Sequence, residues 1–355
     1  MQLRLAPKNT QSLLPTDILF QTGYWAQVKS RLGCKPMAFD ILTPGSKGDM
    51  LVLIQPFGEH GLAAYVPQGP ECGPSPEDRG PYLENLSEAL KRHLDPAVAF
   101  IRYDLPWESP YAPEMREKQW SAFPEPRIRE MRMNIGTRTW NLRKAEMDMT
   151  VASSLVVNIE GPEERILSAM KPKTRYNIGL AGRKGVRVSI ASMEELPAFY
   201  DLYCQTALRN GFPTCDYRHF LALFQAHTQN PITSDLVFLL AGHGSDILAG
   251  AIVAVSGKNA IFLHGASSTK NRRLMGSHAL HWAAIRHVRA LGCTRYDMGA
   301  VSPGLSPDHP FYGLYRFKTG FGGKIELRSG SWDFPLNEEV YNAFRNADIL
   351  SRGNF

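Results

Sequence analysis

The chain has 355 residues, a hydrophobic content of 43% and a formal net charge of +6. These values allow two full hydrophobic cores and exclude a disordered or repetitive protein. No apolar run approaches the roughly 20 residues that span a bilayer, and the N-terminus lacks the pattern of a signal peptide, so we expect a cytoplasmic protein. The moderate basic charge suits a phosphate-bearing partner, but by itself it is weak evidence.

Short apolar strands alternate with amphipathic helices along the chain, which predicts an α/β (α+β) fold. β-branched content and turn-rich flanks indicate strands at Leu51–Ile54, Leu62–Val66, Val98–Tyr103, Leu155–Ile159, Val186–Ile190, Leu236–Ala241 and Ile247–Val255.

Three helices are predicted from their apolar stripes. The first carries leucines at 83, 86, 90 and 94. The second begins at Ser192, where Glu195 completes a capping box, and ends at Gly211. The third runs from Ser277 to Gly292. The segment Trp107–Arg143 lacks periodicity, and we interpret it as loop and extended chain.

Two architecturally similar halves follow from this order of elements. A fresh strand and helix series begins near Ser153, and Trp332–Phe355 could return to the first half as a closing strand and helix. We therefore expect a first domain of residues 1–152 plus 331–355 and a second domain of residues 153–330. No residue-level repeat supports the duplication.

The segment Tyr315–Gly323, Y-R-F-K-T-G-F-G-G, is the most informative stretch for chemistry. Its glycines would let the backbone approach a ligand, and Lys318 would offer a point charge to the oxyanion of an acyl transfer. A basic, glycine-rich hairpin on the protein surface is the alternative interpretation of the same residues.

Two other basic segments are candidates for phosphate contacts. The sequence Arg272–His278 resembles the R-x-x-G-x-G/A pyrophosphate loop of GNAT acetyltransferases, but His278 occupies the last small position and should hinder coenzyme A. An ordinary helix start capped by Ser277 is the alternative. The stretch around Lys173 and Arg175 could contact phosphates, although such runs are commonly solvated faces.

Asp104 ends a predicted strand beside Arg102, where its carboxylate could orient or deprotonate an amine. A structural Arg–Asp pair is the commoner explanation. Five scattered cysteines form no C-x-x-C pair, and the histidines form no metal-binding pattern. We therefore expect neither a bound metal nor a cofactor.

Taken in order, several segments resemble the FemABX family of peptidoglycan bridge-forming peptidyltransferases over nearly the whole chain. They are Phe20–Lys29, Tyr65–Pro70, Lys173–Val186, Thr206–Phe212, Gly265–Ser267, Tyr296–Gly299 and Phe317–Phe321.

This resemblance implies two tandem GNAT-like domains with a cleft between them, of the compact type without a coiled-coil arm. It implies transfer of glycine, alanine or serine from aminoacyl-tRNA to UDP-MurNAc-pentapeptide or lipid II, with peripheral membrane contact through a lipid-linked precursor. The first domain would bind the precursor and the second the aminoacyl end.

The resemblance also implies a set of site residues. By similarity, the catalytic residues are Lys318, Phe317 and Asp104. The precursor would contact Lys29, Trp25, Thr206, Arg209 and His264, which stands where the family commonly has a tyrosine. The tRNA phosphates would meet Lys173, Arg175, Arg272 and Arg273.

Two alternatives remain open on the sequence. The same fold supports a coenzyme A-dependent N-acyltransferase, which intact pyrophosphate binding at Arg273–His278 would favour. A non-catalytic basic module that binds nucleic acid or a cell-wall precursor is the other.

Overall fold

The computed structural model describes residues 3–43, 46–57, 61–117, 122–229, 235–304 and 306–352. The chain divides into two compact units. The first comprises the residues up to Ala152, the residues from Leu327 onward and a short segment at Pro303; the second comprises Ser153–Ser302 and Ser306–Glu326. Residues 327–330 thus belong to the first unit, because strand β13 (Lys324–Pro335) runs without a break through the expected boundary at 330.

The first unit is built on a mixed sheet in the order β1-β2-β3-β4-β5-β13, with β6 paired to β13. Only β4 and β5 are parallel, and all other neighbours are antiparallel. The strands are β1 (Arg4–Lys8), β2 (Lys35–Thr43), β3 (Ser46–Pro56), β4 (Leu62–Val66), β5 (Val98–Glu108) and β6 (Arg143–Lys144).

The helices of the first unit are α1 (Gly23–Arg31), α2 (Arg79–Lys91), α3 (Ala112–Glu117), α4 (Pro126–Asn134) and α11 (Glu338–Arg352), with short 3-10 helices η1 (Thr10–Ser12), η2 (Leu19–Gln21) and η3 (Pro76–Asp78). Helix α2 connects the parallel pair β4 and β5 and buries Leu83, Leu86 and Leu90 of its predicted stripe, whereas Leu94 lies beyond the end of the helix and is partly buried. The segment expected to be loop contains α3 and α4. The sequence shows no helical periodicity here because Met133 is the one large apolar side chain of α4 that is buried.

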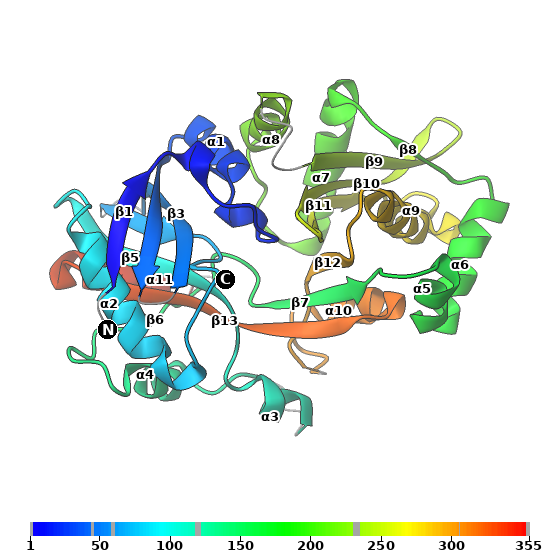
Figure 1. The fold of residues 1–355 in the computed structure, drawn as a ribbon. Coiled ribbons are helices and arrows are strands. Elements are labelled where there is room, and N and C mark those ends of the chain that lie inside the picture. The colour runs from blue at the N-terminus through cyan, green and yellow to red at the C-terminus, as the bar shows by residue number, and fades with distance from the viewer. Residues whose placement is uncertain are drawn as a thin grey trace. The chain divides into compact units, whose positions relative to one another are not determined.

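The second unit repeats this arrangement with the sheet order β7-β12-β11-β10-β9-β8 (Figure 1). Again a single pair, β11 and β12, is parallel, and helix α9 (Gly276–Ala290) connects it. The architectural duplication suspected from the sequence is therefore present in the strand pairing. The strands are β7 (Ser153–Asn158), β8 (Arg187–Ile190), β9 (Asp235–His243), β10 (Asp246–Ser256), β11 (Asn259–Ser267) and β12 (Arg295–Ala300).

Helices cover both faces of the second sheet. Alternate residues of β9 face opposite sides: Val237 and Leu239 join the core under α9, whereas Phe238 packs on Phe199 of α7 and Phe224 of α8. The other helices are α5 (Glu163–Ala169), α6 (Pro172–Arg183), α7 (Leu196–Asn210), α8 (Tyr217–Gln229) and α10 (Tyr312–Lys318), with η4 (Met193–Glu195), η5 (Arg272–Leu274) and η6 (Thr319–Phe321).

The predicted caps of the second unit are partly confirmed. The capping box of Ser192 and Glu195 is formed, and Gly211 ends α7 with φ +69°. Ser277, however, does not cap α9, because that helix begins one residue earlier and its N-cap is Met275, with φ +58°. In the described part of the chain, no helix is long and apolar enough to cross a membrane.

Candidate functional site

The side chain of Lys318 is buried near the point where the parallel strands β11 and β12 stop pairing. The β11 and β12 register ends at Ile261 and Asp297, although both strands continue. Beyond that point the Lys318 Nζ donates a 2.8 Å hydrogen bond to the carbonyl oxygen of Ala300, at the end of β12. The Lys318 side chain comes from the last residue of α10 and is only 5% exposed. The predicted surface hairpin is therefore wrong, since this segment is a helix that inserts a cation into the unit.

Burial lowers the pKa of Lys318 to about 8, and the carboxylate of Asp297 opposes that shift. Asp297 is itself fixed by the hydroxyl of Ser154 at 3.1 Å and by the backbone N–H of Gly299 at 2.8 Å. At neutral pH the ammonium thus remains charged in a nearly water-free environment, where one charge acts strongly.

Aromatic and imidazole rings pack around the segment that carries Lys318. The His281 ring packs on Phe317, Phe321 and Phe262 with centroid distances of 5.5, 5.4 and 4.8 Å, and its Nδ1 lies 3.1 Å from the Tyr296 hydroxyl. Burial, together with the charge of Lys318, lowers the pKa of His281 to about 3. His281 is therefore a neutral wall of the site.

His278 forms a second neutral wall. Its ring lies 5.1 Å from Phe317, and its Nε2 lies 3.2 Å from the amide nitrogen of Asn177. The amide N–H is the donor in that pair, so the Nε2 of His278 accepts and the ring proton resides on Nδ1. Burial and nearby Lys173 lower the pKa of His278 to about 4. The imidazole thus packs against the Lys318 segment beside the first turn of α9.

The glycines that follow Lys318 leave room for atoms of neighbouring segments of the same unit. A Cβ on Gly320 would overlap the hydroxyl of Thr174 at the start of α6, and one on Gly322 would lie 2.9 Å from the carbonyl oxygen of Ala169. Gly323 is crowded in the same way by the backbone of Val156. The expectation that these glycines let the backbone approach a ligand is therefore corrected: they lock α10 and η6 against α6 and β7.

Two predicted precursor contacts meet at the end of β11. The hydroxyl of Thr206 accepts the backbone N–H of Ser267 at 3.0 Å and donates to the Leu202 carbonyl at 2.8 Å. The Arg209 guanidinium donates to the Ser267 carbonyl and hydroxyl at 2.8 and 3.0 Å. Burial, and then the like charge of Arg272, lower the pKa of Arg209. The guanidinium groups of Arg209 and Arg272 thus both act near Ser267, at the end of β11, and this is a suitable place for an anion.

His264 pairs with a residue that the sequence did not single out. Its Nε2 lies 3.1 Å from the Nε2 of His219, which comes from α8. One ring must donate and the other accept, so the pair holds one proton between the two nitrogens. Burial and the neighbouring His219 lower the pKa of His264 to about 3.

In the first unit, the predicted residues Trp25 and Lys29 lie together on α1. The Lys29 ammonium stands 5.3 Å from the Trp25 ring centroid, and Trp25 is 6% exposed. Gln21, just before this helix, donates to the Pro67 carbonyl at 2.5 Å and accepts the backbone N–H of Leu51 at 2.8 Å. The segments Phe20–Lys29 and Tyr65–Pro70 are thereby held together.

Asp104 is 1% exposed and surrounded by hydroxyl donors. It accepts from Tyr65 at 2.5 Å and from Ser331, while burial raises its pKa. Its expected partner Arg102 instead forms a bidentate pair with Asp333 at 2.6 and 2.7 Å. The alternative of a structural Arg102–Asp104 pair is therefore corrected.

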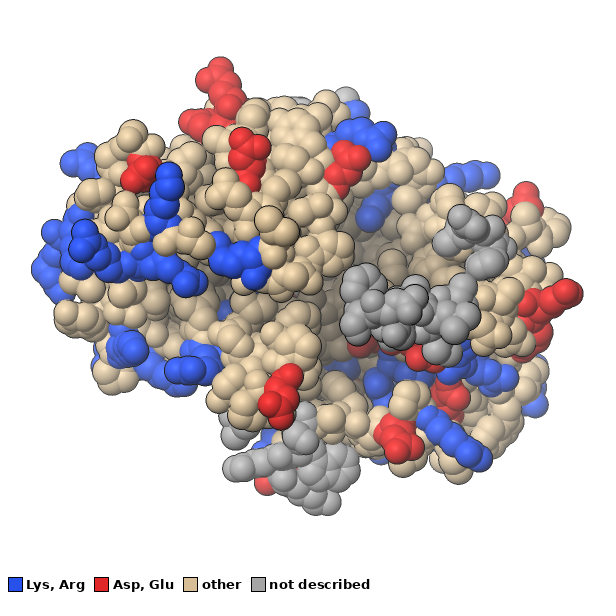
Figure 2. Space-filling view, turned by 180° about the vertical axis from the view of Figure 1, so that it is seen from behind, with Lys and Arg blue, Asp and Glu red and all other residues tan. Residues whose placement is uncertain are grey.

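Lysine and arginine side chains gather over the side of the second unit that carries α5 and α6 (Figure 2). Of the four predicted phosphate contacts, Lys173, Arg272 and Arg273 are exposed there or on η5. Arg175 is also exposed, but it donates to the C-terminal carbonyls of α5, including Leu167 and Ser168 at 3.3 and 3.4 Å. Arg175 therefore serves at least partly as a helix cap.

A family-wide model confirms the resemblance. Residues 15–241 and 236–348 match the model of the FemAB family. The chain belongs to the FemAB family. Among curated relatives of this FemAB member, the lipid II:glycine glycyltransferase of Staphylococcus saprophyticus is 24% identical over 251 residues. That match covers 54% of this chain and 60% of the relative, so the chain spans less than two thirds of the relative's length.

Solved structures confirm the fold expected of a FemAB protein. The crystal structure of FemX superposes with a TM-score of 0.73 at 17% identity, covering 95% of this chain and 96% of that one. A tandem GNAT protein from the clavulanic acid biosynthesis pathway gives 0.50 at 11% identity, with 94% and 98% covered. These likenesses establish the tandem GNAT-like fold.

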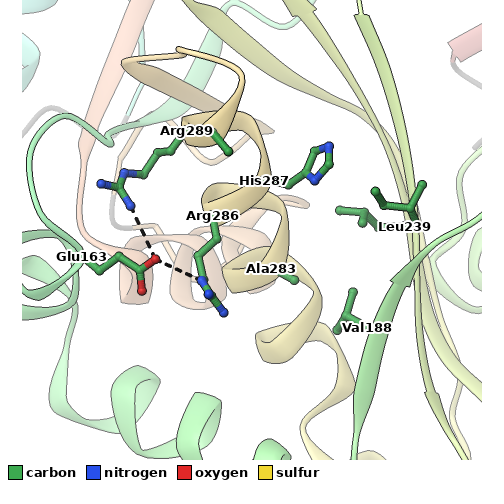
Figure 3. Close-up of a pocket in the computed structure, with 9 residues that line it drawn as sticks. Glu163, Val188, Leu239, Ala283, Arg286, His287 and Arg289 are labelled. Carbon is green, nitrogen blue, oxygen red and sulfur yellow. Dashed lines mark hydrogen bonds and ion pairs between the residues drawn. The ribbon is translucent and has the colours of Figure 1, made fainter.

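An open pocket of the second unit lies away from Lys318. It has a volume of about 550 Å³ and lies between α9 and strands β8 and β9 (Figure 3). Glu163 forms ion pairs with two arginines of its lining, Arg286 at 3.0 Å and Arg289 at 3.6 Å. None of the predicted site residues lines this pocket.

Proposed function

We propose that this protein transfers an aminoacyl group, glycine in the first instance, from aminoacyl-tRNA to an amine on the peptide of a lipid-linked peptidoglycan precursor. The observation that carries the proposal is Lys318, a buried ammonium in a segment that matches the family pattern. The relatives named lipid II:glycine glycyltransferases support the choice of glycine and lipid II.

The chemistry that this cation supports is acyl transfer from an ester. The amine nitrogen attacks the ester carbonyl carbon, a C–N bond forms, the bond to the ribose oxygen breaks, and the amine proton is lost. Negative charge builds on the carbonyl oxygen during the attack. Lys318 has three N–H donors, and in the described ranges only one is used, toward Ala300. The remaining donors suit the oxyanion.

The neutral rings of His278 and His281 strengthen the electrostatic effect of the Lys318 charge. His278 and His281 have low pKa values, so neither competes with Lys318 as a cation at neutral pH. Phe317 is half-buried between these rings and provides an apolar surface for the aminoacyl end. A charge in such surroundings stabilises a developing oxyanion more than the same charge in water.

Other predicted residues receive separate roles in the proposal. Arg209 and Thr206 in the second unit, and Lys29 in the first unit, are assigned to phosphates of the precursor, and His264 to its peptide. Lys173, Arg175, Arg272 and Arg273 are assigned to tRNA phosphates. Asp104, surrounded by hydroxyl donors, is assigned to holding β4 and β13 together through Tyr65 and Ser331. The proton of the attacking amine then leaves to substrate or solvent.

The testing experiment measures transfer of labelled glycine, alanine or serine from charged tRNA to lipid II and, separately, to UDP-MurNAc-pentapeptide. We expect glycine on lipid II. Product on the UDP-linked acceptor alone would correct the acceptor. No product on either, together with acetyl-coenzyme A binding, would replace the proposal by the coenzyme A-dependent reaction.

A further inference from the structure

Helix α4 of the first unit presents an apolar stripe to solvent. Ile128 and Met131 lie one turn apart and are 52% and 55% exposed, and Ile135, directly after the helix, is 63% exposed. Trp140, five residues on, is 51% exposed. Single exposed apolar residues are ordinary, but several in one short segment indicate an interaction surface. Figure 1 shows α4 at the periphery of its unit.

The same segment is basic. Between Glu125 and Arg143 there are five arginines and two glutamates. Glu130 is already engaged, since it accepts the backbone N–H of Lys144 at 2.8 Å and pairs with Arg345 at 3.6 Å. Arg127 and Arg132 are both exposed on α4. The charge of this segment therefore favours an anionic partner for the apolar stripe.

Beside the stripe lies a small pocket with three arginines, Arg79, Arg129 and Arg132, and no carboxylate in its lining. The Arg79 side chain donates to the Glu108 carbonyl at 2.8 Å, but its buried Nε has no hydrogen-bond partner. Arg79 is 9% exposed. The hydrogen-bond acceptors of Arg79 are a carbonyl and the hydroxyl of Ser329, so within the described residues no carboxylate forms an ion pair with this guanidinium.

The other two arginines are held by aromatic rings. Arg129 stands 5.0 Å from the Phe123 ring and donates to the Ser329 carbonyl at 3.2 Å. Arg132 stands 5.1 Å from the Tyr111 ring, and no ion pair to it is formed within the described residues. Flat aromatic faces orient guanidinium groups without neutralising them. The pocket itself has a volume of only about 20 Å³, room for a single water molecule, so an anion would meet these guanidinium groups at its mouth.

We propose that the α4 surface docks onto an anionic phospholipid bilayer, with lipid phosphates against the exposed Arg127 and Arg132 and the apolar stripe in the interfacial region. A basic face beside exposed isoleucine, methionine and tryptophan is typical of helices that lie in a membrane interface. Nucleic acid would use the arginines but would leave the apolar stripe in water. The proposal rests on this surface and is independent of the transfer reaction.

The experiment is co-sedimentation of the whole chain with vesicles of phosphatidylcholine, with and without phosphatidylglycerol. We expect binding only to the vesicles that contain phosphatidylglycerol. The double variants I128D/M131D and R127E/R132E should each weaken partitioning by at least about tenfold, because each buried apolar group and each surface arginine contributes. All four side chains are exposed, so the variants should remain folded, which circular dichroism checks.

Matched controls separate this surface from the rest of the chain. L208D changes an apolar side chain that is 88% exposed in the second unit, and K173E/R183E reverses two exposed charges on α6. Both controls should bind within about twofold of the parent chain. Loss of binding in K173E/R183E with retention in R127E/R132E would overturn the proposal. So would a monomer–dimer equilibrium in sedimentation velocity that the α4 variants abolish, because it would identify a second copy as the occupant.

Discussion

The Nζ of Lys318 donates to the carbonyl oxygen of Ala300 at 2.8 Å, at the point where β11 no longer pairs with β12. The ammonium thus replaces a neighbouring strand as the partner of a backbone oxygen. It is fixed by one bond and retains other N–H donors, which is the arrangement that an oxyanion needs.

The pKa of Lys318, about 8, predicts an alkaline loss of activity. Below that value the side chain is cationic, and above it the charge is lost. The acceptor amine complicates a simple profile because it becomes more nucleophilic as pH rises. We therefore compare the parent chain with Lys318→Arg, whose guanidinium stays charged throughout. The ratio of parent to variant rates should fall as pH passes about 8, measured by single-turnover transfer. A ratio that rises instead would make Lys318 a base.

The close packing of Gly320 against Thr174 can be tested with a pair of variants. The added Cβ of Gly320→Ala would overlap the hydroxyl of Thr174, so the variant should be destabilised by about 1–3 kcal/mol and lose transfer activity. Thr174→Ala removes the overlapping atoms, and the double variant should recover most of both losses. Urea denaturation and the transfer assay measure them. Equal losses in the single and double variants would mean that Gly320 has another role.

The buried pair Arg102–Asp333 should dominate the stability of the first unit. Asp333→Ala leaves the Arg102 guanidinium buried and unpaired, at a cost of about 3–5 kcal/mol in the free energy of unfolding. As a matched control, Glu108→Ala breaks the exposed pair with Arg116 and should cost less than about 1 kcal/mol. Chemical denaturation checks both. Similar costs for the two variants would contradict this ranking.

The hydrogen bond between the rings of His219 and His264 predicts that substitutions at the two positions have non-additive effects on the free energy of unfolding. Replacing either ring by phenylalanine removes the hydrogen bond between the two rings, at about 1–2 kcal/mol, whereas replacing both should cost less than the sum. If His264 also contacts the acceptor peptide, His264→Phe should raise the KM for that acceptor several-fold with little change in kcat. Additive stability losses would show that the two rings act independently.

The sequence predicts local structure well where one segment decides it. All seven predicted strands are present because each is rich in apolar and β-branched residues and lies between turn-rich segments. The Ser192–Glu195 capping box forms because both partners lie within one turn. Strand β11 escaped prediction because His264 and Gly265 interrupt its apolar run, and β12 because Asp297 and Gly299 do the same.

The candidate site was predictable only in part. The family pattern points to Lys318, but its burial depends on contacts with residues far away along the chain, such as His281 and Thr174. The pairing of His264 with His219 spans 45 positions. The Tyr296–Gly299 motif was the one local signal for Asp297, whose influence on Lys318 appears only when α10 packs against β12.

The measurement that tests the central claim most directly is glycine transfer from charged tRNA to lipid II by Lys318→Met. The variant removes a buried charge whose pKa shift corresponds to about 3 kcal/mol, but it leaves the Ala300 oxygen without a donor, at about 1–3 kcal/mol. These effects nearly cancel, so we predict a folded protein whose unfolding free energy lies within about 2 kcal/mol of the parent value. Its kcat should fall about 10²–10³-fold. A folded variant that transfers glycine at the parent rate would contradict the account.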